Sequence, residues 1–408
     1  MQWTRTQKNA VFAAYLGWTL DAFDFFLMVF VFSDVAREFH SSNVTATIPL
    51  TLTLAARPIG AYLFGRLGDR YGRKPVLMWN ILAFSILEAL SGLSPNITTL
   101  LAVRFLFGIA MGGEWGLGSA LTFETIPVSG RGLVSGLLQA GYPSGFFLAT
   151  LAYRFFYDDL GWRWLFFIGA VPSLLVLFIW RGVEESPGWI EQRHRKDASA
   201  LWPVLRREWK LALYAIVLMT CFNFFSHGSQ DTYPNLFLKQ QHHFDTHLVS
   251  AITMILNVGA ICGGLGFGFL SQRIGRRRAI MLAATLALPV LPFWAFSGTP
   301  LVLAVSAFLM QVSVQGAWGI VPVHLNELSP PAIRATFPGV VYQLGSLFAS
   351  VNAPLQVWIA EANGGNYGLA MAVVIGTVSV LIILMAAWGP ERRDIAMADA
   401  HRAATTEP

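Results

Sequence analysis

The side chains best able to hold a proton or an anion lie inside apolar stretches of the chain. Asn223, His227 and Asp231 are spaced by four residues, which places them on one face of a helix. Histidine ordinarily changes charge near neutral pH, so it can accept and release a proton. A stripe of hydrogen-bonding groups favours a helix that faces a water-filled cavity, although a lone buried histidine can also be an ordinary core residue. Pro234 is expected to end or bend this helix.

More ionisable residues lie in earlier apolar stretches. Asp21 and Asp24 are three apart and share a helix face, and Arg57 and Glu114 lie at a similar expected depth. An ionisable group inside a membrane is costly and marks a functional site by default. Three carboxyls around one guanidinium cannot all be charged, so at least one is expected to hold a proton. The alternative role for Arg57 is a structural salt bridge, most simply to Asp24, whereas Arg104 is expected to snorkel or cap.

The stretches that carry these residues are long enough to cross a bilayer. The 408 residues are 55% hydrophobic and only 12% charged, whereas soluble domains contain about 25% charged residues. No stretch has the alternation of barrel strands, so we predict an all-α membrane protein with twelve transmembrane helices, each near the roughly 20 residues that span a membrane. The predicted spans are 11–33, 46–65, 76–95, 98–122, 132–155, 163–181, 210–235, 247–270, 279–297, 300–326, 336–359 and 368–389.

The positive charges predict how the chain is oriented. Most of the 28 Lys and Arg residues lie at the termini and in the loops that join these segments on one side. Positive loops remain in the cytoplasm, so both termini are expected there, in an inner or plasma membrane. The start of the chain lacks the pattern of a cleaved signal peptide. The net charge of +5 therefore reflects membrane topology and contact with the bilayer rather than binding of a nucleic acid.

Two motifs repeat at the same offset. GRLGDRYGRK at 65–74 recurs as GFLSQRIGRR at 268–277, and the stretch from Glu124 recurs from Glu327, each 203 residues later. We therefore predict two pseudo-symmetric six-helix halves, an arrangement in which the substrate site lies between the halves. The predicted boundaries are 1–181 for the first half, 182–209 for a cytoplasmic linker, 210–390 for the second half and 391–408 for a cytoplasmic tail.

The charged residues of these loops are candidates for gating. Their glycines permit close helix approach and a tight turn, and their charges can form a network that holds one conformation and breaks in another. The alternative is a cluster that faces lipid headgroups and only determines topology. The predicted gating residues are Gly65, Asp69, Arg70, Gly72, Arg73, Glu124, Arg131, Arg273, Arg276, Glu327 and Arg334.

The repeated loop resembles a known family signature. GRLGDRYGRK resembles the loop 2–3 signature of the major facilitator superfamily, and EESPGW at 184–189 resembles its PESPRW motif. The resemblance covers the whole chain and implies the major facilitator fold. The second copy departs from the signature at Gln272, where the family has Asp, so a gate contact is expected to be weaker there.

The polar stripe resembles one branch of that superfamily. The pattern N-x-x-S-H-x-S-Q-D is similar to a signature of fungal lactate–pyruvate permeases in the sialate:proton symporter branch, and LDAFDF at 20–25 and GGEWG at 112–116 are similar to that branch too. The resemblance implies that Asn223, His227 and Asp231 are critical for transport, that Arg57 binds a carboxylate and that Gln343 contributes to specificity. Gln139 and Tyr142 are the candidate counterparts of Gln343 in the first half.

These observations predict a secondary transporter that works as a monomer and needs no cofactor or metal. The substrate is expected to be a small organic anion, a monocarboxylate such as lactate or pyruvate, carried with a proton by alternating access. Substrate binding is assigned to Arg57, Asn223, His227, Gln343, Gln139 and Tyr142, and proton coupling to Asp21, Asp24, Glu114, His227 and Asp231. Sialic acid or another organic anion is the alternative, and a sugar is less favoured. A channel, a receptor and a membrane enzyme are the other classes, and the sequence lacks the metal-ligand cluster, Ser/His/Asp set or phosphate loop that an enzyme would use.

Overall fold

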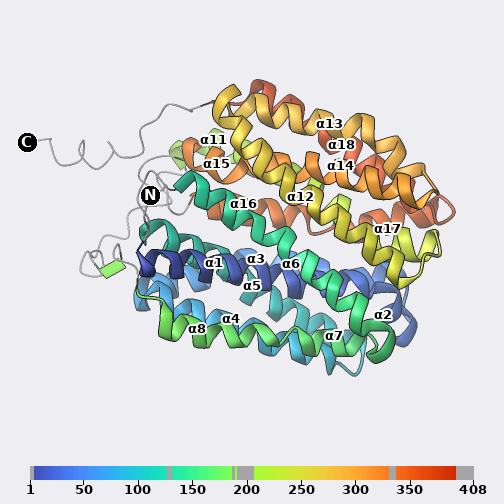
Figure 1. Ribbon diagram of the computed structural model, residues 1–408, viewed down its shortest axis with the longest axis horizontal. Coiled ribbons are helices and arrows are strands. Elements are labelled where there is room, and N and C mark those ends of the chain that lie inside the picture. Colours follow the sequence, from blue (N-terminus) through green and yellow to red (C-terminus); the bar gives the residue numbers. More distant parts are fainter. Residues whose placement is uncertain (1–3, 126–130, 186–188, 191–205, 330–336, 392–408) are drawn as a thin grey trace, which may run out of the picture.

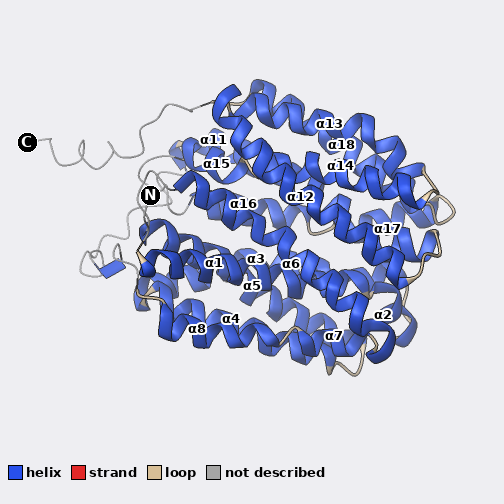
Figure 2. Ribbon diagram, in the orientation of Figure 1, coloured by secondary structure: helices blue, strands red, loops and turns tan. Residues whose placement is uncertain are grey.

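The computed structural model describes the chain except for residues 1–3, 126–130, 186–188, 191–205, 330–336 and 392–408, and the described part is helical throughout (Figure 2). The first half comprises α1 (Arg5–Phe30), α2 (Phe32–Glu38), α3 (Asn43–Tyr71), α4 (Arg73–Gly92), α5 (Ile97–Thr125), α6 (Arg131–Leu160), α7 (Trp162–Ile168), η2 (Val171–Leu174) and α8 (Leu175–Gly182). The second comprises α11 (Trp209–Gln230), η3 (Tyr233–Gln241), α12 (Thr246–Ile274), α13 (Arg276–Phe296), α14 (Pro300–Trp318), α15 (Val321–Leu328), α16 (Phe337–Ala349), α17 (Asn352–Ala362) and α18 (Tyr367–Trp388).

Each predicted span coincides with one long helix or with short helices in series. Within the described residues, 8 helices are long and apolar enough to cross a membrane. Of the other four spans, α3 and α6 are long but more polar, and the sixth and eleventh are divided into α7–η2–α8 and α16–α17. The predicted linker 182–209 and tail 391–408 lie largely outside the described residues.

The helices form two bundles that meet along their length. Figure 1 shows the blue-to-green helices of the first half beneath the yellow-to-red helices of the second. The two bundles meet where α6 packs against α12 and where α3 packs against α16 and α17. Helix α1 begins and α18 ends at one end of the assembly, which we call the terminal end, and α2 lies at the opposite end, the far end (Figure 1).

Glycines bring α3 and α5 into direct backbone contact. A Cβ at Gly108 would overlap the Thr53 backbone, and one at Gly112 would overlap the Arg57 backbone. The same arrangement recurs in the second half, where Gly259 of α12 lies against α14. Small residues at such positions are the usual means of close helix packing in membranes. The contact fixes the height of Arg57 relative to α5.

The repeated loops adopt the same tight turn in both halves. Gly72 and Gly275 end α3 and α12 with φ angles of 108° and 97°, a backbone conformation that favours glycine. The Arg276 guanidinium forms a buried ion pair with Glu327 at 3.0 Å. Of the other predicted gating residues, Arg334 lies outside the described residues, and the side chains of Asp69, Glu124 and Arg131 are likewise not described.

A charged network joins the two halves at the far end. Lys239 of η3 donates to the Tyr157 hydroxyl at 2.7 Å, and that hydroxyl donates to Asp34 Oδ2 at 2.7 Å. Asn235, also on η3, donates to the Phe30 carbonyl at 2.6 Å, where α1 ends. The segment after Pro234 is wound as a π-helix, in agreement with the predicted break. The two halves are therefore joined at the far end by hydrogen bonds that cross between them.

The short helix α2 is anchored beside this network. Trp162 Nε1 donates to Glu38 at 2.6 Å, and Arg163 Nη2 pairs with the same carboxylate at 2.6 Å. Burial alone would raise the pKa of Glu38, but these hydrogen bonds and the charge of Arg163 outweigh it, so the pKa lies below its ordinary value. The carboxylate therefore stays charged and holds α2 in place.

We predict that Gly112→Ala destabilises the protein, because its new methyl group would force α3 and α5 apart. Overpacking of this kind costs about 1–3 kcal/mol. The control is Gly116→Ala on the same helix, where the methyl group meets nothing within 4 Å. Alanine is a better helix former than glycine by roughly 1 kcal/mol, so the control should keep or gain stability. Thermal unfolding in detergent measures both, and equal losses would contradict the packing argument.

Candidate functional site

Three ionisable side chains meet in the interior of the first half. Asp21 of α1, Arg57 of α3 and Glu114 of α5 are each at most 1% exposed, and the charge of Arg57 acts on both carboxyls. Arg57 Nη2 donates to Met111 Sδ at 2.9 Å, and a thioether is only a weak acceptor. Arg57 Nε and Nη1 have no hydrogen-bond partner in the described part of the chain. The arginine therefore keeps donors that can bind an anion.

Phe25 separates this cluster from the polar stripe on α11. Its ring centroid lies 5.5 Å from Arg57 Cζ and 5.5 Å from the centroid of His227. His227 Nδ1 lies 3.1 Å from Asp231 Oδ1, and both residues are at most 3% exposed. Asn223, in the same stripe, donates to a backbone carbonyl one turn earlier at 2.8 Å. Arg57 of the first half and His227 of the second thus both lie within 5.5 Å of the Phe25 ring centroid.

Tyr142 of α6 lies among charges from both halves. Asp231, Arg57 and Asp21 all act electrostatically on its hydroxyl. Its ring stacks on Trp18 with 5.7 Å between centroids. The Tyr142 hydroxyl and the Trp18 indole N–H find no hydrogen-bond partner among the residues described. Both are donors, so they extend the set of groups available to an acidic ligand.

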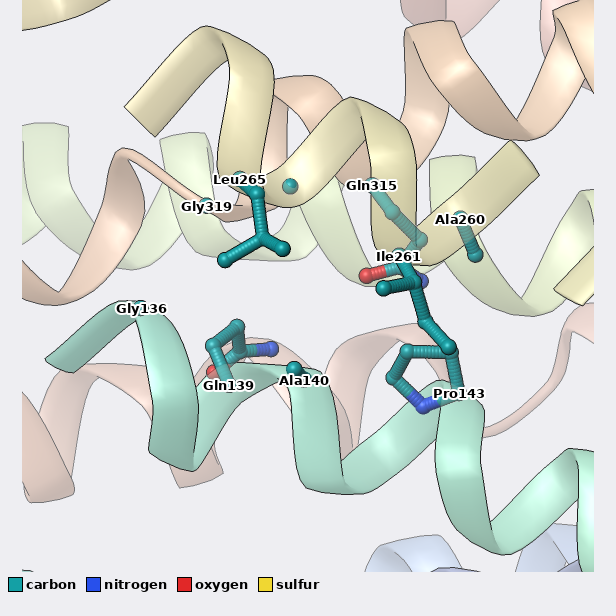
Figure 3. A pocket seen from close by; sticks show the side chains of 10 residues that line it. Gly136, Gln139, Ala140, Pro143, Ala260, Ile261, Leu265, Gln315 and Gly319 are labelled. Carbon is teal, nitrogen blue, oxygen red and sulfur yellow. The ribbon is translucent and has the colours of Figure 1, made fainter. Parts of the chain in front are cut away.

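The two predicted glutamines lie apart. Gln139 lines a cavity between α6 and α12 that also contains Gln315 of α14 (Figure 3). The cavity volume is about 10 Å³, room for about one water molecule. Gln343 of α16 is 4% exposed, and its Oε1 accepts no hydrogen bond from the described residues. Gln139 therefore faces a small, mainly apolar cavity, and the Gln343 carbonyl is a buried acceptor without a partner among the described residues.

A network of buried amides in the second half was not predicted. Gln230 Nε2 donates to Gln311 Oε1 at 2.8 Å, and Gln311 Nε2 donates to Ser229 at 2.8 Å. Gln315 Nε2 donates to Ser226 at 3.3 Å. The spacing of four residues between Gln311 and Gln315 in an apolar stretch was an available signal, because it places both on one face of α14.

A second buried cluster of charged residues shows that the expected role of Arg104 and the alternative role of Arg57 were wrong. Arg104 neither snorkels nor caps: it is 1% exposed and pairs with Glu88, with an Nη1–Oε2 distance of 3.1 Å. Arg57 has no salt bridge to Asp24, whose two carboxyl oxygens accept no hydrogen bond from the described residues. Asp24 instead lies near Glu88 and Arg104, whose charges act on it. Depth along a helix, from which the pairing with Arg57 was argued, does not determine which helix face is the neighbour.

The site is therefore suited to hold an anion and protons. No group of three His, Cys, Asp or Glu residues that could bind a metal occurs in the described ranges. The buried guanidinium has unused donors and carboxyls beside it, and the histidine–aspartate pair lies in the other half of a bundle of membrane-length helices. The family model of the Major Facilitator Superfamily matches residues 10–230, and that of the sugar (and other) transporters matches residues 211–393. The chain belongs to the major facilitator superfamily, so it is a multi-pass membrane transporter and not an enzyme.

Similar proteins extend over almost the whole chain. The sialic acid transporter NanX of Escherichia coli is 31% identical over 389 residues, 93% of each chain. A carboxylic acid transporter protein homolog of Saccharomyces cerevisiae is 28% identical over 94% of this chain and 68% of its own. The cis,cis-muconate transport protein of Acinetobacter baylyi is 26% identical over 95% and 97%.

A solved structure supports the fold. The xylose transporter XylE from E. coli superposes with a TM-score of 0.76 at 19% identity and covers 96% of this chain and 100% of its own. The predicted major facilitator fold is thereby confirmed.

We predict that Glu88→Gln destabilises the protein by about 3–5 kcal/mol, because it leaves Arg104 charged and buried without its partner. Arg104 lies between the rings of Phe107 and Phe166, at 4.8 and 4.7 Å, and has no route to water. The double variant Glu88→Gln/Arg104→Gln should recover most of the loss. Unfolding curves in detergent measure all three proteins, and a stable single variant would mean that the ion pair contributes little.

Proposed function

We propose that the chain is a proton-coupled symporter of a small monocarboxylate such as lactate or pyruvate. The observation that carries this proposal is the buried Arg57, with Nε and Nη1 unpartnered within the described residues. A guanidinium holds a carboxylate by two parallel hydrogen bonds, and a buried charge without such a partner is costly. A carboxylate that enters from solution supplies the missing partner.

The names of the relatives support an acid as the substrate. Three of them are a sialic acid transporter, a carboxylic acid transporter homolog and a cis,cis-muconate transport protein. Sialic acid or another organic anion is the alternative substrate in the same site. A sugar is less favoured, because an uncharged ligand would leave the Arg57 donors without an anion. Asn223, His227, Gln343, Gln139 and Tyr142 supply further hydrogen bonds from both halves.

Charge balance supports coupling to a proton. Asp21 and Glu114 lie beside Arg57 with no hydrogen bond from any described residue. When the substrate carboxylate pairs with Arg57, the two side-chain carboxyls lose its compensating charge, and low dielectric disfavours their ionised forms. A proton then binds with the substrate. Asp24 nearby, and His227 with Asp231 across the interface, complete the proposed set of proton-binding groups.

The gates and the topology complete the proposal. We assign the terminal end to the cytoplasm of an inner or plasma membrane, which places the Lys239 network at the outer side. The E. coli inner membrane metabolite transport protein YhjE, 26% identical over 93% of this chain, supports that location. The buried Arg276–Glu327 pair belongs to the inner gate, together with the predicted charges of the first repeated loop. One chain carries the whole path, and the proposed domain boundaries remain those of the sequence.

Transport by purified protein in vesicles tests the proposal. Acid outside should drive accumulation of labelled pyruvate or lactate, and a protonophore should abolish it. The control replaces the pH gradient with a sodium gradient at equal pH, which should drive nothing. Accumulation driven by sodium alone would contradict proton coupling, and uptake of sialic acid without uptake of either small acid would favour the alternative substrate.

We predict that Arg57→Lys binds pyruvate far more weakly, because an ammonium cannot reproduce the two parallel hydrogen bonds. Loss of such a contact costs on the order of 2–5 kcal/mol, which is roughly 30-fold to several thousand-fold in affinity. Equilibrium binding to the purified proteins measures the change. The matched control is Asp21→Asn/Arg57→Gln, which removes the internal charges together. Near-normal affinity in this double variant would make Arg57 a structural residue.

A further inference from the structure

Aromatic rings from both halves surround the Arg57 guanidinium. Phe25 of α1 lies under it, with 5.5 Å between Arg57 Cζ and the ring centroid. The Tyr342 hydroxyl of α16 lies beside the same group. Tyr342 in turn packs edge-on against Trp115 of α5 and Trp318 of α14, with centroids 5.4 and 5.5 Å apart. Phe25 and Tyr342 therefore flank the cation directly, and Trp115 and Trp318 extend this aromatic cluster behind Tyr342.

These rings lie along the route between Arg57 and the terminal end. Gly112 of α5 packs on the Arg57 backbone, and Trp115 follows it by three residues, about one helical turn nearer the terminal end. Trp318 is flanked in the sequence by Gln315 and Gly319, which line the cavity of Figure 3. A ligand that reaches Arg57 from this end must pass the faces and edges of these indoles.

Buried polar groups without a partner lie on Arg57 and on a neighbouring aromatic pair, Tyr142 and Trp18. Arg57 Nε and Nη1, the Tyr142 hydroxyl and the Trp18 indole N–H are buried and unpartnered within the described residues. Aromatic rings that fill an ordinary core pack on aliphatic groups and need no donors beside them. Here the Arg57 guanidinium lies beside the Phe25 ring, and the Tyr142 and Trp18 donors belong to two rings that stack on each other. The combination is suited to a ligand with a charged end and a flat, polarisable body.

We propose that the substrate is a planar conjugated monocarboxylate, whose carboxylate binds Arg57 and whose π-system stacks on the rings of Phe25, Tyr342 and Trp115. The inference rests on the proposed function and, within it, favours a conjugated acid such as pyruvate over a saturated one such as lactate. Aromatic pairs prefer offset-stacked or edge-to-face geometry and are favoured beyond the area that they bury. A saturated ring of the same size is thicker and has no π-face, so it loses this gain but keeps the contact with Arg57.

The test compares two acids that differ only in conjugation. Binding of benzoate and of cyclohexanecarboxylate to the purified protein is measured by calorimetry, and the smaller pair acrylate and propionate repeats the comparison. The wild-type protein should bind the conjugated member of each pair about tenfold more tightly, as expected for one or two favourable ring contacts. Equal affinities within both pairs would overturn the inference and leave the carboxylate site intact. If neither acid binds but a pentose does, the proposed function fails as well.

Two variants test which rings cause the preference for the conjugated acid. Phe25→Leu and Trp115→Leu should each reduce the ratio of benzoate affinity to cyclohexanecarboxylate affinity at least threefold. The control is Trp358→Leu on α17, which removes an indole that is 63% exposed and should leave the preference intact. Phe25→Tyr keeps the ring and should keep the preference, which separates stacking from loss of folding. A preference that survives both leucine variants would mean that these rings do not hold the substrate.

Discussion

A charge in the interior of a membrane protein must be paired, neutralised or supplied with a ligand, and the first half of this protein contains both a paired and an unpaired arginine. Arg104 is held by Glu88 and enclosed by two phenyl rings, so the protein itself satisfies it. Arg57 is equally buried, but its Nη2 donates to a sulfur, and its Nε and Nη1 have no hydrogen-bond partner among the described residues. The glycine contact between α3 and α5 fixes it at that height. The contrast between the two arginines separates a structural ion pair from a binding site within one bundle.

The second half accommodates its buried polar side chains in a different way. Gln230, Gln311 and Ser229 are joined by hydrogen bonds across α11 and α14, and amide groups need no change of charge to form them. This half therefore places neutral amides beside the titratable pair of His227 and Asp231. Phe25 stands between the charged bundle and the amide bundle. A ligand that moves the Phe25 ring therefore changes a contact in each half.

The sequence predicted the features that depend on local pattern. The length of the apolar stretches predicted the spans. The four-residue spacing of Asn223, His227 and Asp231 predicted the polar stripe on α11. It did not predict the Glu88–Arg104 pair, because residues on two helices become neighbours only through packing, which depth along each helix does not determine. Glu88 was also overlooked as a single acid in an apolar stretch. The far-end contacts of Lys239 and Asn235 depend on how η3 is wound, and helix periodicity alone does not predict a π-helix.

The network of Asp34, Tyr157 and Lys239 determines how the far end can open. Its hydrogen bonds join the two halves there, and Asn235 adds a bond across the same interface. The halves can separate at this end only if these groups exchange one another for water. The strength of this latch therefore helps to determine how much time the protein spends with its far end apart.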